Sequence, residues 1–81
     1  MSLQNEMRRT AKTNLEYKSK RLRGEIEGIA RLISINLDCG LHKPEALPID
    51  EIDGQWDDLK SKWAELIAAE AEITRLEEEL K

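Results

Sequence analysis

The sequence predicts an all-α protein in which two long helices fold back on each other as an antiparallel hairpin. Three observations favour this fold. Apolar residues recur three and four positions apart in two long segments, as they do along one face of a helix. A segment with one glycine and two prolines separates them, and proline does not allow a helix to continue. The two segments also carry opposite charge. We expect a single domain over residues 1–81.

The first helix is expected over about residues 5–39. Its apolar register runs through Leu15, Leu22, Ile26, Ile29 and Ile33, with the polar residues Ser19 and Asn36 in the remaining positions. Before Leu15 the same register falls on Arg8 and Lys12, so we expect that part of the helix to be held less firmly. We base no expectation on residues 1–3, because the sequence leaves open whether they are native.

The turn is expected over about residues 40–49 and the second helix over about 50–80. Gly40 is placed to end the first helix in a left-handed cap. Asp50 and Asp53 resemble an N-terminal capping pair. The apolar register of the second helix is Ile52, Trp56, Leu59, Trp63, Leu66, Ile73 and Leu80, interrupted by Glu70 and Glu77. Ala69 and Leu76 lie beside these two interruptions, which indicates a stripe that drifts around the helix.

The charge distribution predicts that the two helices run in opposite directions. Residues 1–23 hold seven basic and two acidic side chains, a net charge of +5, and residues 45–81 hold four basic and twelve acidic ones, a net charge of −8. In an antiparallel hairpin, residues whose numbers add up to about 88 face each other. The basic part of the first helix then meets the acidic part of the second. Exposed ion pairs add little stability, but they select an orientation.

The apolar surface exceeds what one hairpin can bury, which predicts self-association. A second stripe lies beside the first on helix one, and the two tryptophans add bulk near the same end of the hairpin. We expect these residues to form an interface: Gly24, Gly28, Ile29, Leu32, Ile33, Ile35, Leu37, Trp56 and Trp63. A symmetric homodimer that forms a four-helix bundle is the simplest way to cover them, although the sequence leaves dimer and tetramer open.

Gly24 and Gly28 allow two interpretations. Each glycine inside a helix costs about 1 kcal/mol relative to alanine, which suggests a compensating role. Spaced four apart, the pair would open a notch for another helix or for the ring of Trp63. The alternative is that both are tolerated surface residues. We favour the notch.

No set of residues indicates catalysis, a cofactor or a metal. Cys39 and His42 are the sole cysteine and histidine, and a structural zinc site needs four ligands. His42 is the sole candidate base for Cys39, and nothing in the sequence orients it. The paired and tripled acidic residues belong to solvated helix faces. We therefore expect a protein that is not an enzyme and that has no cofactor.

The predicted function is that of a small structural or interaction protein, a homodimer that docks on a larger, unidentified protein partner. A single cysteine and the lack of a signal peptide or a membrane-length apolar run indicate a cytoplasmic protein. The alternative is a nucleic-acid-binding accessory protein, because basic side chains along a helix can follow a phosphate backbone. Its candidate residues are Arg8, Arg9, Lys12, Lys18, Lys20, Arg21 and Arg23.

Overall fold

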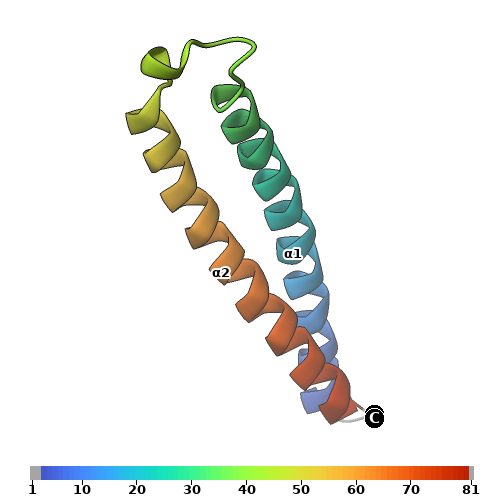
Figure 1. Ribbon diagram of the computed structural model, residues 1–81. Coiled ribbons are helices and arrows are strands. Elements are labelled where there is room, and N and C mark those ends of the chain that lie inside the picture. Colours follow the sequence, from blue (N-terminus) through green and yellow to red (C-terminus); the bar gives the residue numbers. More distant parts are fainter. Residues whose placement is uncertain (1–2, 81) are drawn as a thin grey trace.

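The computed structural model describes residues 3–80 and places them in two long helices joined by a short connection (Figure 1). Helix α1 covers Leu3–Asn36, a single 3-10 turn η1 covers Pro44–Ala46, and helix α2 covers Ile49–Leu80. The helices pack against each other in opposite directions, and the chain measures 63 × 15 × 15 Å. The all-α hairpin expected from the sequence is confirmed. Neither described helix has a stretch apolar enough, over sufficient length, to cross a membrane.

Helix α1 contacts α2 along the register expected from its sequence. The residues at alternating spacings of four and three are all buried or half-buried: Arg8, Lys12, Leu15, Ser19, Leu22, Ile26, Ile29, Ile33 and Asn36. The helix begins at Leu3, and its part before Leu15 is held to α2 by side chains that form ion pairs. Long charged side chains can bury their alkyl stems while their charged ends reach a partner.

The register of α2 differs from the expected one. The residues that face α1 are Ile52, Gln55, Leu59, Lys62, Leu66, Ala69, Ile73, Leu76 and Leu80. Trp56 and Trp63 lie one position to the side of this seam, and 50% and 57% of their surfaces are exposed. Since a helix turns as a rigid rod, facing the tryptophans inward would also turn Glu70 and Glu77 inward. The observed rotation buries Ala69 and Leu76 in their place.

The buried core lies in the half of the hairpin away from the turn. Among the described residues, the apolar side chains that are fully buried are Leu22, Ala69, Ile73 and Leu76, and the polar one is Ser19. Toward the turn, the seam residues of both helices are half-buried. The hairpin is therefore well packed near its free ends and open to solvent near its turn.

Asp38 organises the end of α1 in place of the expected glycine cap. The helix ends at Asn36, three residues before the expected boundary. The Asp38 carbonyl accepts hydrogen bonds from the backbone N–H groups of Leu41 and His42 at 3.0 and 3.1 Å, and its carboxylate accepts one from Gly40 at 2.7 Å. Among the described residues no glycine has a positive φ, so the left-handed cap at Gly40 is wrong. The aspartate side chain satisfies the backbone locally, as in an Asx turn.

Helix α2 begins one residue earlier than expected, at Ile49. The N–H of Ile52 donates to the carbonyl of Pro48 at 3.0 Å, so the first helical hydrogen bond starts from the proline. Asp50 and Glu51 occupy the first turn, where the positive end of the helix dipole favours negative charge. The turn between the helices thus combines a proline-led 3-10 segment with a proline-led helix start.

Candidate protein-interaction surface

Four ion pairs join the two helices and report their alignment. Arg8 Nε lies 3.1 Å from Glu79 Oε2, and Lys12 Nζ lies 3.6 Å from Glu77 Oε1. Nearer the turn, the corresponding distances are 2.5 Å for Arg23 and Glu70 and 3.0 Å for Lys62 and Glu25. The residue numbers in each pair add up to between 87 and 93. This agrees with the expected antiparallel alignment of a basic with an acidic segment.

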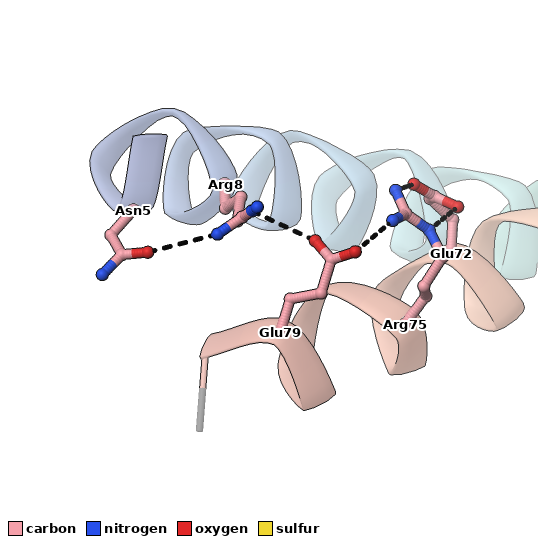
Figure 2. Close-up of polar contacts among 5 residues, drawn as sticks. All are labelled: Asn5, Arg8, Glu72, Arg75 and Glu79. Atoms are coloured by element: carbon pink, nitrogen blue, oxygen red, sulfur yellow. Dashed lines mark hydrogen bonds and ion pairs between the residues drawn. The ribbon is translucent and has the colours of Figure 1, made fainter. Parts of the chain in front are cut away.

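A continuous polar network covers the free end of the hairpin (Figure 2). The guanidinium of Arg8, on α1, donates to Asn5 and pairs with Glu79, on α2. Arg75 donates to the other oxygen of Glu79 at 2.6 Å and also to both oxygens of Glu72. Hydrogen bonds from Arg75 lower the pKa of Glu72 below its usual value. Cations from both helices therefore offset the negative charge near the C-terminus of α2, where the helix dipole disfavours it.

Ser19, Arg23 and Glu70 form a second polar cluster beside the buried core. The Ser19 hydroxyl donates to a carboxylate oxygen of Glu70, and the Arg23 guanidinium donates to the same oxygen. These two hydrogen bonds, that of Ser19 first, lower the pKa of Glu70 below its usual value. The buried hydroxyl of Ser19 is satisfied in this way, so a polar residue is accommodated in the seam.

Because the pKa of Glu70 is lower in the folded chain, its ionised form should stabilise the hairpin above pH about 4.5, the usual pKa of a glutamate. This stabilisation is lost as the pH falls through the lowered pKa. We expect Glu70→Gln to reduce the fall in unfolding free energy between pH 6 and pH 2, as measured by urea titrations followed by circular dichroism. Glu78→Gln is the matched control for the loss of one negative charge. An unchanged pH dependence in Glu70→Gln would contradict the cluster.

The basic residues of the nucleic-acid alternative are largely engaged with acidic ones. Arg8, Lys12 and Arg23 pair with glutamates of α2. Arg21 lies 3.6 Å from Glu25 on its own helix. Arg9, Lys18 and Lys20 are exposed, and Arg9 also has an interaction partner. The electrostatic surface offered to a phosphate backbone is therefore smaller than the seven cations alone suggest.

A shallow apolar groove lies between the helices in the turn half of the hairpin. Its volume is about 440 Å³, and its lining residues are Ile26 and Ala30 from α1 with Trp56, Leu59, Lys60 and Trp63 from α2. Lys60 is the charged residue among these six, and the other five are apolar. The groove forms because small Ala30 faces the side of α2 that carries the two bulky indoles. Its walls are large, apolar and half-exposed, which is typical of an interaction surface.

The indoles belong to a longer apolar stripe along one side of α2, here called the tryptophan stripe: Ile49, Trp56, Trp63 and Ile67. The spacings of seven, seven and four place all four residues on one side of a helix. Each is exposed over about half of its surface, from 48% at Ile67 to 61% at Ile49. The stripe thus runs parallel to the seam that contacts α1, and the described residues leave about half of its surface uncovered.

The interface residues expected from the sequence divide into three groups. Ile29 and Ile33 lie in the seam between the helices, and Trp56 and Trp63 lie in the tryptophan stripe. Gly24, Gly28, Leu32 and Ile35 form a separate outer stripe on α1, and Leu37 follows the end of that helix. At 100° per residue, Leu32 lies about 200° around α1 from Ala30. The exposed part of the expected single patch is therefore divided between two surfaces on different sides of the hairpin, and Ile29 and Ile33 belong to the seam.

The sequence did not lead us to four residues of the groove and the tryptophan stripe. Ala30 and Lys60 line the groove, and Ile49 and Ile67 extend the stripe. The signal for the isoleucines was present, because both continue the spacing of Trp56 and Trp63. It was obscured when the tryptophans were assigned to the seam between the helices.

The glycine notch expected on α1 is not occupied by Trp63. A Cβ atom built on Gly24 or Gly28 would meet no other atom within 4 Å. The indole lines the groove that Ile26 and Ala30 border on the other side of α1. Within the hairpin, these glycines face open space.

Replacing Gly24 or Gly28 with alanine should therefore stabilise the hairpin by about 0.5–1 kcal/mol each, because alanine loses less backbone entropy in a helix. Thermal and urea unfolding would measure the gain. Gly40→Ala is the matched control, since its Cβ would lie 3.0 Å from Asp38 Oδ1, and no gain is expected there. A loss of stability in Gly24→Ala or Gly28→Ala would show that an assembly uses these positions for close contact.

Cys39 and His42 lie in the turn and do not form a site together with acidic residues. Cys39 is exposed, and its thiol contacts the Leu37 carbonyl at 3.9 Å. Within residues 3–80, no group of three or more histidine, cysteine, aspartate or glutamate side chains is arranged to hold a metal ion.

Comparison of the chain with protein families, with curated proteins and with solved structures gives no match.

Proposed function

We propose that this protein is a non-enzymatic interaction module, a helical hairpin that dimerises through the tryptophan stripe and docks on a larger protein. The observation that carries this proposal is the row of four large apolar side chains left half-exposed along α2. Two of them are tryptophans, the residue type that most often dominates the energy of protein interfaces. The proposed setting is the cytoplasm, where the exposed thiol of Cys39 would stay reduced.

The distribution of burial supports self-association. A chain of 81 residues buries a small core, and here that core is confined to the half away from the turn. Pairing the turn halves of two copies would add apolar burial where each hairpin lacks it. The free energy gained per area is about 25 cal/mol per Å², and a tryptophan presents 150–250 Å² in total.

The outer stripe of α1 remains available in such a dimer. Leu32 and Ile35 are 52% and 51% exposed and lie on a different side of the hairpin from the groove. Since each dimer would present two such stripes, it is suited to a role as a connector between larger proteins.

Sedimentation equilibrium between about 1 and 200 μM tests the self-association, a range suited to weak and moderate dimers. We expect a monomer–dimer equilibrium. Both tryptophans of the chain belong to the stripe, so their fluorescence emission should shift to shorter wavelength as the concentration rises. A folded monomer at every concentration, with unchanged emission, would refute dimerisation.

Nucleic-acid binding is the alternative function, and it needs an experiment of its own. The test is fluorescence anisotropy with labelled duplex and single-stranded DNA at about 50 mM salt, because contacts with phosphate are strong at low salt. We expect no binding, because at least four of the seven basic residues already pair with glutamates. Binding that disappears after charge reversal at Lys18 and Lys20 would replace the interaction-module proposal with this one.

A further inference from the structure

We propose that the partner of the tryptophan stripe is a second copy of this chain whose α2 lies antiparallel across it, centred near Leu59 and Lys60. This inference rests on the proposed self-association and adds the face and the orientation of the two copies. It concerns the stripe formed by Ile49, Trp56, Trp63 and Ile67, which is half-exposed along its whole length.

The stripe belongs mainly to one helix, which determines what a symmetric dimer can look like. All four of its residues lie on α2, whereas α1 contributes Ile26 and Ala30 at the edge of the groove. A twofold axis makes the same patch contact itself. The stripe of one copy therefore meets that of the other when α2 packs on α2, in either a parallel or an antiparallel direction.

The charges along α2 favour the antiparallel direction. Residues 50–58 contain five acidic side chains and no basic one, a charge of −5, whereas residues 60–68 contain two lysines and one glutamate, a charge of +1. In a parallel pair, each charged segment would face the same segment of the other copy, so that a charge of −5 lies against a charge of −5. In an antiparallel pair centred near Lys60, the −5 segment of each copy faces the +1 segment of the other, so this favourable contact occurs twice. Such complementarity selects one orientation among those that bury the same apolar surface.

Lys60 supplies a further contact between the paired stripes. Its side chain lines the groove between the two indoles, and it pairs with Asp57 at 3.3 Å on the outer surface. In the antiparallel pair, the lysine of one copy lies over the indole side of the other. An ammonium group near the face of a tryptophan is attracted to it.

The polar part of the same side of the hairpin explains why the overlap stops short of the free ends. Beyond Ile67, the surface between the helices is lined by charged residues, among them Glu70 and Arg23, which form an ion pair. Covering this pair would remove it from water at a cost that a new apolar contact does not recover there. The antiparallel overlap of the two α2 helices ends at this pair, because Glu70 of one copy lies level with Ile49, the first residue of α2, in the other. The free ends of the two hairpins then point in opposite directions.

Spin labels near the free ends distinguish the two orientations. Glu78 is exposed on α2, and Cys39 is the single cysteine of the chain, so Glu78→Cys in a Cys39→Ser background accepts one label per copy. At 1.5 Å per residue, the antiparallel pair places the two labels roughly 55–60 Å apart. A parallel pair of helices, with axes about 8–10 Å apart, places them within roughly 30 Å. Double electron–electron resonance measures this distance, and sedimentation of the same labelled sample confirms the dimer.

The results of these two measurements separate the orientation of the two copies from the dimerisation itself. A dimer with the long distance supports the antiparallel pair. A dimer with the short distance overturns the orientation and leaves the proposed self-association standing, whereas a monomer in sedimentation overturns both.

Charge reversal at Lys60 tests the same arrangement without labels. Lys60→Glu should weaken the dimer about tenfold at low salt, because it turns a +1 segment that faces a −5 segment into one of −1. The loss should shrink near 0.5 M salt, where charges are screened over a few ångströms. Lys18→Glu, which reverses an exposed lysine of α1 in the opposite half of the hairpin, is the matched control and should leave the dimer unchanged. Equal effects of the two variants would contradict the inference.

Discussion

Replacing Leu22 with alanine is expected to lower the unfolding free energy by about 2–5 kcal/mol, enough to unfold much of a small hairpin. Leu22 is the most deeply buried side chain among the described residues, with 1% of its surface exposed. It belongs to the same compact core as Ile73 and Ala69, and the alanine would leave a cavity there. Urea unfolding followed by circular dichroism at 222 nm, at a fixed protein concentration, would measure the loss.

Leu32→Ala is the matched control for Leu22→Ala. It removes the same atoms from the same helix, but Leu32 is 52% exposed on the outer stripe. We expect a change within about 1 kcal/mol, because few contacts are lost at an exposed position and alanine favours the helix. Similar losses in the two variants would mean that the packed half of the hairpin does not hold the fold together.

Replacing Trp56 and Trp63 together with alanine is expected to raise the dissociation constant of the dimer at least 100-fold while the hairpin stays folded. Each indole is half-exposed in the single chain, so it contributes less to the hairpin than to an assembly that covers it fully. A central tryptophan at an interface commonly contributes 2 kcal/mol or more. Sedimentation measures association, and circular dichroism checks that the helices remain.

The matched control for the tryptophan variant lies on the other side of the hairpin. The double change Leu32→Ala and Ile35→Ala removes comparable exposed apolar surface from the outer stripe of α1. That variant should dimerise like the original chain. Were it to become monomeric while the tryptophan variant remained a dimer, the interface would have to be moved to the outer stripe.

Local patterns in the chain were sufficient for much of the hairpin. The apolar register of α1, from Leu15 to Ile33, agrees with the side that contacts α2. The charge asymmetry predicted the antiparallel direction, and pairs such as Arg8–Glu79 and Lys12–Glu77 agree with it. These predictions succeed because periodic burial and long-range charge depend on many residues, so a few exceptions do not change the result.

The end of α1 shows where local patterns were not enough. Glycine after a helix commonly adopts a left-handed conformation, but Gly40 does not. Asp38, two residues earlier, binds the N–H of Gly40 through its carboxylate and reverses the chain without a positive φ. Aspartate and glycine compete for the same role in turns, and the sequence order alone does not decide between them.

By itself, the sequence determined that this protein consists of two amphipathic helices, where they break, and that the basic end of one meets the acidic end of the other. Only the tertiary structure decided the rotation of α2. Its sequence offers two overlapping stripes, one through Trp56 and Trp63 and one through Ala69 and Leu76, and a rigid helix can turn only one of them toward α1. Packing against α1 buries Ala69 and Leu76, leaves Glu70 at the edge where Ser19 and Arg23 bind it, and turns both indoles outward. The candidate interaction surface is a consequence of that rotation.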